Sequence, residues 1–270
     1  MSTPNLAIFA DFENVAIGVR DAKYDKFDVS LVLERLLDKG KIVVKKAYAD
    51  WDRYKADRRP LHEAAFELIE IPHVSYSGKN SADIRMVVDA LDLCYTKEHV
   101  QVFVIVSGDS DFSPLVSKLR ENDKTVIGVG VKNSSSDLLI ENCDEFIYYD
   151  ELVQKKDGRG RRKKSSGGAR KSKKAAARTE KPAEGEGDPQ EAFALVIDQV
   201  EALLAERDQP PHASMVKQTL KRKRPNFSEG YYGFRTFNDL VEEAERRGLL
   251  VLTKDQKGGG YVVEGLGEEA

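Results

Sequence analysis

An apolar run that ends in two carboxylates constrains the fold of this chain most. Residues 102–106 read VFVIV, and residues 107–112 read SGDSDF. Four of the five apolar residues are β-branched, which is typical of a strand buried on both faces of a parallel sheet. Ligands of open α/β sheets bind beyond the carboxyl ends of the strands, so Asp109 and Asp111 stand where a site is expected. Capping of the next helix would also explain either residue alone.

Apolar runs alternate with helical patterns over residues 1–154. This alternation predicts an α/β domain with three layers around a parallel sheet. The predicted strands are residues 6–10, 42–48, 71–76, 102–106, 125–130 and 145–149, and the predicted helices are 30–39, 58–70, 83–95, 112–122 and 138–143.

Acidic residues recur at the ends of these predicted elements. Asp11 ends the first strand, and Asn14 follows three residues later. Asp83 falls in the first turn of a helix, where the helix dipole favours an anion. Asp89 lies six residues further on, about 120° around an ideal helix, so we expect it either to support the site residues from outside or to have a structural role. Because a doubly wound sheet gathers its strand ends along one edge, these acids are expected to meet Asp109 and Asp111 there.

Four carboxylates brought together suggest a metal site. Close carboxylates repel and raise one another's pKa, and a hard divalent cation such as Mg²⁺ or Mn²⁺ relieves the repulsion. Such a site suits metal-assisted hydrolysis of a phosphodiester. No P-loop, G-x-S-x-G or H-E-x-x-H motif is present. Ser107 and Ser110 have no recognisable base, so we expect them to orient Asp109 and Asp111.

Length and composition bound the remaining possibilities. A chain of 270 residues suffices for one sizeable domain and a smaller one. No apolar run approaches the ~20 residues of a membrane span, and the N-terminal sequence does not resemble a signal peptide. With two cysteines, Cys94 and Cys143, a disulfide framework is not expected. We therefore expect a soluble, cytoplasmic protein.

A basic tract separates two acidic parts of the chain. Residues 155–181 hold thirteen Lys and Arg against two acidic residues, whereas the whole chain has a net charge of −3. Residues 155–190 contain almost no large apolar residue and are predicted to be a disordered linker. The charge suggests a polyanionic partner, although a solvated tether without a partner would have the same composition.

Residues 191–266 are predicted to form a second, small domain. Amphipathic helices are expected at 192–206, 213–221 and 237–247, followed by strands at 249–252 and 261–263. Helices followed by a two-stranded ribbon suggest a winged helix-turn-helix. A small protein-interaction domain is the alternative.

Three motifs in residues 4–150 resemble the NYN domain family of PIN-like nucleases, which includes LabA-like bacterial proteins. The motifs are DFEN at 11–14, KNSADIRMVVD at 79–89 and SGDSDF at 107–112. The resemblance implies a PIN-like α/β fold, acidic metal ligands and ribonuclease activity. By position, it implies that Asp11, Asp83 and Asp109 bind the metal. Asp111 matches a further acid, and Asn14 matches the companion polar residue of the first motif.

The C-terminal part resembles the OST-HTH (LOTUS) domain. The matching segments are 214–220, 224–227 and 232–237, together with the apolar run 249–252. The resemblance implies a winged-helix module that binds RNA, in some relatives G-rich structured RNA, or a protein partner.

Together these features favour a Mg²⁺- or Mn²⁺-dependent ribonuclease with a tethered RNA-binding module. Phosphates of single-stranded or structured RNA would be bound by Arg161, Arg162, Lys163 and Lys164 of the linker and by Lys221, Arg222, Lys223 and Arg224. Tyr231 and Tyr232, with Phe234, would stack on bases, or else pack in a core.

Two other functions stay open, as does the oligomeric state. One is a non-catalytic RNA-binding or regulatory adaptor that retains the fold, and the other is a nuclease for DNA or for RNA/DNA hybrids. The full set of acids argues against the adaptor. PIN-like domains often pair, so a homodimer is possible.

Overall fold

The computed structural model describes residues 3–71, 81–154, 187–206, 209–254 and 260–270. The chain separates into two compact units, Met1–Lys163 and Lys164–Ala270, which are described separately. The described elements of the first unit are β1 (Asn5–Asp11), α1 (Phe12–Asp21), α2 (Val29–Leu37), β2 (Lys41–Ala49), α3 (Lys55–Glu63), β3 (Glu67–Glu70), α4 (Ser81–Thr96), β4 (Val102–Val106), η1 (Ser110–Phe112), α5 (Ser113–Glu121), β5 (Thr125–Gly130), η2 (Lys132–Ser134), α6 (Asp137–Asn142) and β6 (Glu145–Tyr148).

The sheet of this unit confirms the predicted parallel α/β architecture. Its six strands have the order β3-β2-β1-β4-β5-β6, and every neighbouring pair is parallel. The order reverses between β1 and β4, which makes their carboxyl ends the topological switch point, the place where open α/β sheets bind ligands.

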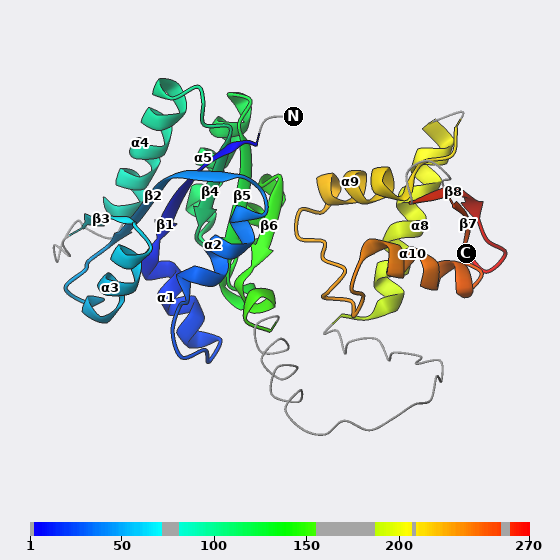
Figure 1. Ribbon diagram of the computed structural model, residues 1–270, viewed down its shortest axis with the longest axis horizontal. Helices are drawn as coiled ribbons and strands as arrows, with labels where there is room; N and C mark the ends of the chain where they lie inside the picture. The colour runs from blue at the N-terminus through cyan, green and yellow to red at the C-terminus, as the bar shows by residue number, and fades with distance from the viewer. Residues whose placement is uncertain (1–2, 72–80, 155–186, 207–208, 255–259) are drawn as a thin grey trace, which may run out of the picture. The chain divides into compact units, whose positions relative to one another are not determined.

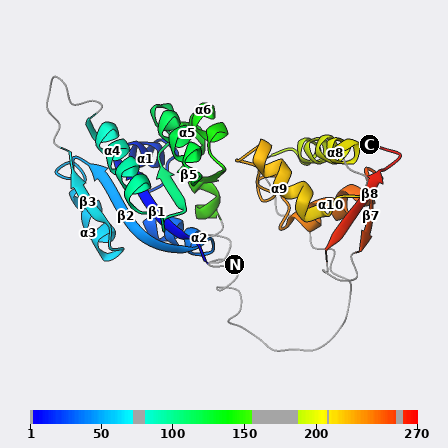
Figure 2. The ribbon, with the colours of Figure 1, turned by 90° about the horizontal axis from the view of Figure 1, so that it is seen from above.

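Alternate residues of the central strands face two separate cores, as the strand period of two requires. Leu6 and Ile8 of β1 pack with residues of α1, α2 and α3. Ala7 and Phe9, on the opposite face, pack with residues of α4, α5 and α6. Figures 1 and 2 show these helices covering the two faces of the sheet. The predicted three-layer arrangement is therefore confirmed.

The region of α3 and β3 differs from the sequence prediction. The helix predicted at 58–70 ends at Glu63, and residues 67–70 form β3 instead. A Schellman motif ends the helix: the Phe66 amide donates to the Leu61 carbonyl, and Ala65 takes a positive φ of 57°. Because Ala occupies the position that Gly normally marks, the stop has no sequence signal. Most of the strand predicted at 71–76 lies outside the described residues.

Within its described residues, the second unit has three helices followed by an antiparallel pair of strands. These are α8 (Pro189–Glu206), α9 (Ala213–Lys223), α10 (Phe237–Arg246), β7 (Leu250–Lys254) and β8 (Tyr261–Leu266). Apolar residues from all five elements form one core. A reciprocal capping box between Thr236 and Asp239 fixes the start of α10. The winged helix-turn-helix interpretation of this unit stays a prediction.

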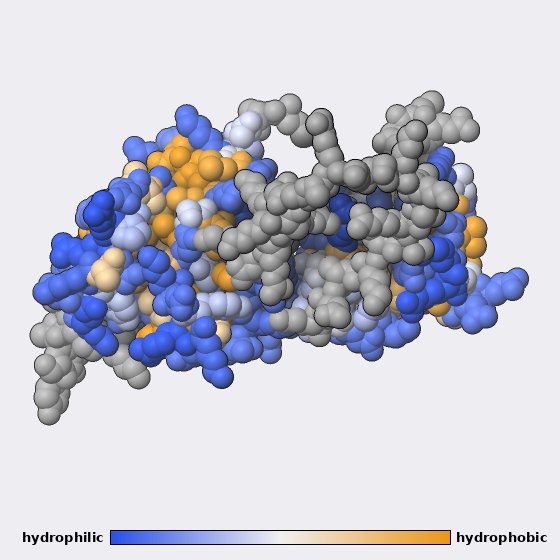
Figure 3. Space-filling model, turned by 60° about the horizontal axis from the view of Figure 1, so that its bottom comes forward, coloured by the Kyte–Doolittle hydropathy of each residue, from blue (hydrophilic) through white to orange (hydrophobic). Residues whose placement is uncertain are grey.

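Apolar side chains are unevenly distributed over the surface of the N-terminal unit. Figure 3 shows hydrophobic residues gathered in one area of this unit, with largely hydrophilic surface around it. The exposed large apolar residues also include Ile84 and Val88 of α4 and Leu138 of α6. Within the described ranges, no helix combines the length and the apolarity needed to cross a bilayer.

Candidate active site

Asp11 lies where β1 passes into α1, at the switch point of the sheet. Its carboxylate caps the helix, since Oδ1 accepts a hydrogen bond from the Asn14 backbone amide at 3.3 Å. Oδ2 accepts a second bond from the Ser107 hydroxyl at 3.2 Å. The residue is only 7% exposed. Asp11 is therefore a buried carboxylate that is fixed through both oxygens.

The turn after β4 is tied to α1 and to Asp11. The Ser107 hydroxyl that donates to Asp11 also accepts a bond from the Asp109 amide at 3.2 Å. The Gly108 amide donates to Asn14 Oδ1 at 2.9 Å. A Cβ at Gly108 would lie 2.3 Å from the Ser134 carbonyl oxygen, so only glycine fits there. These bonds hold two segments that are far apart in sequence in one fixed arrangement.

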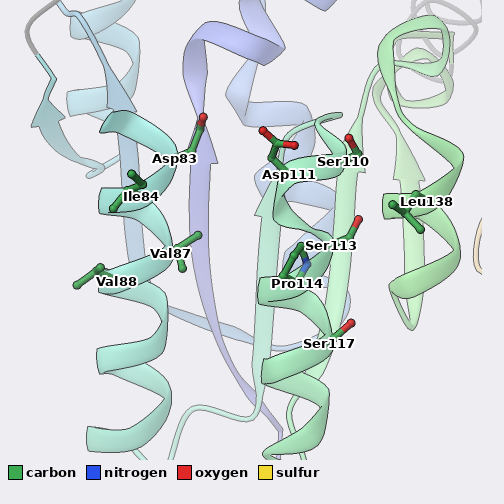
Figure 4. A pocket seen from close by; sticks show the side chains of 10 residues that line it. All are labelled: Asp83, Ile84, Val87, Val88, Ser110, Asp111, Ser113, Pro114, Ser117 and Leu138. Atoms are coloured by element: carbon green, nitrogen blue, oxygen red, sulfur yellow. The ribbon is translucent and has the colours of Figure 1, made fainter. Parts of the chain in front are cut away.

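The remaining acids come from the same turn and from α4. Asp109 Oδ1 accepts a bond from the Asp111 amide at 3.0 Å, so Asp109 does cap the short helix η1, as the capping alternative predicted. Asp111 itself is exposed. Asp83 lies in the first turn of α4, as predicted. Figure 4 shows Asp83 and Asp111 at the same end of a cleft that is lined by residues of α4, η1, α5 and α6.

The pKa of Asp11 is raised from 3.8 to about 7. Burial is the main cause, because it disfavours the charged form, and the Asp83 carboxylate adds to it. The hydrogen bonds from Asn14 and Ser107 lower the pKa, and Asp109 raises it slightly. Asp11 is therefore a carboxylate whose protonation changes near neutral pH.

Asp83 shares this electrostatic environment. Burial raises its pKa, and so do the carboxylates of Asp109, Asp111 and Glu13, in that order. Acids from β1, α4 and the turn after β4 thus act on one another, as the sequence predicted. The structure brings Asp11, Asp83, Asp109 and Asp111 into one neighbourhood.

The chemistry of these side chains fits a hard divalent cation. All four carry carboxylate oxygens, and a cation would relieve the repulsion that raises their pKa values. Among the residues that the structure describes, no three His, Cys, Asp or Glu side chains are grouped closely enough to hold an ion together. Mg²⁺ generally binds through one or two carboxylates and keeps several waters. The site can therefore bind Mg²⁺ without three acids in contact with the ion.

Asp89 has the structural role that its position on α4 predicted. It accepts a hydrogen bond from the Tyr48 hydroxyl at 2.9 Å, and it forms ion pairs with Lys46 at 3.3 Å and Arg85 at 3.2 Å. Its carboxylate therefore joins α4 to β2.

Two residues near the site have roles that the sequence did not reveal. Ser107 was expected to orient Asp109, and its hydroxyl does accept a bond from the Asp109 amide; the same hydroxyl also donates to Asp11, which is 96 residues away in sequence. Glu13 accepts a bond from the Asp50 amide at 2.9 Å and thereby anchors the loop after β2. Ser110 lines the cleft. The bonds of Ser107 and Glu13 join residues that are far apart in sequence, so they become visible only when neighbouring strands are placed side by side.

The predicted RNA-binding residues of the second unit lie in two environments. Arg222, Lys223 and Arg224 are exposed at the end of α9, next to Lys221. Tyr232 is only 8% exposed and belongs to the core, which favours the packing alternative over base stacking. Tyr231 is partly buried, and its ring contacts Tyr232 edge-on at 4.9 Å between centroids. The linker residues Arg161, Arg162, Lys163 and Lys164 lie outside the described residues.

The first unit is thus an α/β domain with a doubly wound strand order, and acidic residues gather at the switch point of its sheet. Residues 5–150, more than half of the chain, match the model of the NYN domain, so the chain belongs to the NYN domain family. This confirms the resemblance stated for its N-terminal part and makes it a PIN-like protein of the nuclease superfamily. The OST-HTH resemblance stays a prediction.

The chain is similar to two proteins whose own functions are not known. The chain is 29% identical over 136 residues to an uncharacterized protein, MJ0482, of Methanocaldococcus jannaschii, and the match covers 48% of this chain and 53% of the relative. The chain thus spans about half the length of that relative. A crystal structure of VPA0982 from Vibrio parahaemolyticus, of unknown function, has 27% identity and a TM-score of 0.50 over 56% of this chain and 95% of its own.

Proposed function

We propose that this protein is a metal-dependent ribonuclease whose acidic cluster hydrolyses RNA phosphodiester bonds. One observation carries the proposal: acids from β1, α4 and the turn after β4 are brought together at the switch point, where the buried Asp11 is fixed through both carboxylate oxygens and its pKa is raised. Strongly perturbed acids at such a position are typical of functional sites. Membership of the NYN domain family supports the same reaction class.

In this proposal Mg²⁺ or Mn²⁺ binds among Asp11, Asp83 and Asp109, through one or two of these carboxylates at a time and otherwise through water, and Asp111 adds a further acid at the exposed edge. When bound, such an ion would lower the pKa of a water and would stabilise charge on the phosphate oxygens. Ser107 keeps Asp11 in place through its hydroxyl. Asn14 fixes the turn that carries Asp109 through its bond to the Gly108 amide.

The second unit acts in this proposal as an OST-HTH module that binds the substrate RNA. The exposed basic residues at the end of α9 contact phosphates, so binding weakens as salt rises. Replacement of Arg222, Lys223 and Arg224 by Ala should weaken binding of all RNA sequences alike and reduce the dependence of binding on salt.

Cleavage of labelled single-stranded RNA tests the nuclease proposal. Wild type, Asp109→Asn and Asp92→Asn are each incubated with Mg²⁺, Mn²⁺ or EDTA. Asp92 is an exposed acid on α4, so its variant makes the same change of charge away from the site. Cleavage that requires the metal and is lost only in Asp109→Asn supports the proposal.

A non-catalytic RNA-binding adaptor is the alternative. It is favoured by the finding that no three acids are grouped to hold an ion in the described part of the chain. Undiminished RNA binding with no cleavage under any metal condition would establish it. A matched DNA substrate that is cut faster than RNA would instead indicate a DNA nuclease.

A further inference from the structure

A cleft runs beside the acidic cluster, between α4, the η1–α5 turn and α6. Its volume is about 670 Å³, and Asp83 and Asp111 lie at one end of it. Its apolar walls are unusually open to solvent: Ile84 is 62% exposed, and Val88 and Leu138 are each 55% exposed. An exposed apolar lining next to a polar site is typical of a surface that binds a ligand.

A row of serines forms the polar side of this cleft. Ser110, Ser113 and Ser117 are spaced by three and four residues, which places them on one face of the η1–α5 segment. Figure 4 shows their side chains one above another along this segment, on the side nearer Leu138. This row of serines thus lies along the cleft beside its apolar walls, with the hydroxyl of Ser113 buried.

Of these three serines, Ser113 gives the clearest indication that the cleft binds a ligand. The residue is only 6% exposed, and its hydroxyl has no hydrogen-bond partner in the part of the chain that the structure describes. A buried polar atom without a partner is rare in proteins because it has lost its water without compensation. A ligand in the cleft that bonded to Ser113 would supply that compensation.

The lining selects a neutral ligand with apolar faces and a polar edge. Lys and Arg are absent from the described residues that line the cleft, so phosphate has no positive partner there. A nucleobase has the required character, since its faces pack on apolar side chains and its edge exchanges hydrogen bonds. A serine hydroxyl both donates and accepts, so it suits the edge of any base.

We propose that this cleft binds the nucleobase next to the scissile phosphate, with the Ser113 hydroxyl bonded to the edge of the base. The inference rests on the proposed function, because it takes an RNA strand as the substrate at the carboxylates. It adds a subsite that holds the strand in register with Asp83 and Asp111.

Methyl NMR of the full chain tests the subsite without any cleavage. In EDTA, the methyl groups of Ile84, Val88 and Leu138 are followed as a tetraribonucleotide is added, and then an oligonucleotide of equal charge that carries one abasic position. We expect these methyl signals to shift with the first ligand and to shift far less when the base in the cleft is missing. Local signals keep the result independent of RNA bound by the second unit.

A serine variant gives the second readout. Ser113→Ala removes one neutral hydrogen bond to the base, so the affinity read from the same methyl signals should fall about fivefold. Its melting temperature should not fall, because the hydroxyl has no partner within the described chain. Ser30→Ala, at an exposed serine of α2 that does not line the cleft, should change affinity by less than about twofold.

The possible outcomes separate the two proposals. Base-dependent shifts without cleavage in Mg²⁺ or Mn²⁺ support the subsite and overturn the nuclease. Metal-dependent cleavage with equal shifts for the base-containing and abasic ligands supports the nuclease and overturns the subsite. Shifts that grow with protein concentration in the absence of RNA also overturn the subsite, because they assign the cleft to a contact between two copies of the chain.

Discussion

Replacement of Asp11 by Asn should stabilise the N-terminal unit at alkaline pH. Burial raises the pKa of Asp11 from 3.8 to about 7, so the folded protein holds a proton that the unfolded chain releases. The stability associated with that proton is complete below pH 3.8 and is lost as the pH rises through 7. In the absence of a divalent cation, the wild type should therefore become less stable from pH 5 to pH 8.

The size of the effect follows from the shift in pKa. A shift from 3.8 to about 7 corresponds to about 4 kcal/mol of lost stability at pH 8 and to about 2 kcal/mol at pH 5. The Asn side chain removes this penalty but replaces one of two acceptor oxygens, which costs about 1 kcal/mol. Asp11→Asn should thus be about 3 kcal/mol more stable than wild type at pH 8 and only about 1 kcal/mol more stable at pH 5.

Tryptophan fluorescence during urea unfolding measures the stability of the N-terminal unit, which contains Asp11. Trp51 is the only tryptophan in the chain, and it is 1% exposed in the N-terminal unit. Its ring lies 5.2 Å from that of Phe12, the residue after Asp11. The signal therefore reports unfolding around the site even if the second unit unfolds separately.

Addition of Mg²⁺ and a control variant complete the test. Saturating Mg²⁺ should stabilise the wild type at pH 8 but leave Asp11→Asn unchanged, because only the wild type keeps the full set of acids. Asp92→Asn, an exposed position, should behave as the wild type does. Equal stability of wild type at pH 5 and pH 8 in EDTA, with no gain in stability in Asp11→Asn, would refute the inference that burial raises the pKa of the Asp11 carboxylate.

Three further variants probe the support of the site. Gly108→Ala should lower stability by about 1–3 kcal/mol in thermal unfolding, because its Cβ would meet the Ser134 carbonyl oxygen at 2.3 Å; an unchanged melting temperature would contradict the close approach. Ser107→Ala removes a donor to Asp11, so in the urea series described above the loss of stability should extend to higher pH; a series identical to that of wild type would argue against this bond. Asp89→Asn should lower stability by about 1–3 kcal/mol and leave the metal-dependent cleavage rate of the folded protein unchanged, so a selective loss of cleavage would give Asp89 a direct role.

The sheet could be predicted from the sequence because its central strands are short runs of apolar, mostly β-branched residues. Runs such as VFVIV at 102–106 are buried on both faces, and their residues do alternate between the two cores. The predictions that were wrong concern a helix end that no residue type marks. Ala65 adopts a left-handed conformation that Gly usually supplies, so the sequence shows a helix where β3 begins.

The acids of the site could also be predicted, but the bonds that hold them could not. A strand that ends in Asp is visible in the sequence, and the parallel topology then brings such ends together. The bond from Ser107 to Asp11 depends instead on the register between β1 and β4, in which Ala10 lies beside Val106. The buried hydroxyl of Ser113 likewise has no sequence signature, since its lack of a partner among the described residues is a property of the packed structure.

The acidic cluster is costly to the fold, and this cost is the strongest argument that it serves a function. A buried carboxylate near other carboxylates destabilises the folded state at neutral pH, whereas a neutral residue of the same size would not. The structure nevertheless fixes Asp11 through both oxygens and ties the turn of Asp109 to it through Ser107 and Asn14. Such bonds keep the charges together rather than letting them separate into solvent. An arrangement of this kind is expected where a cation or a substrate supplies the missing stabilisation.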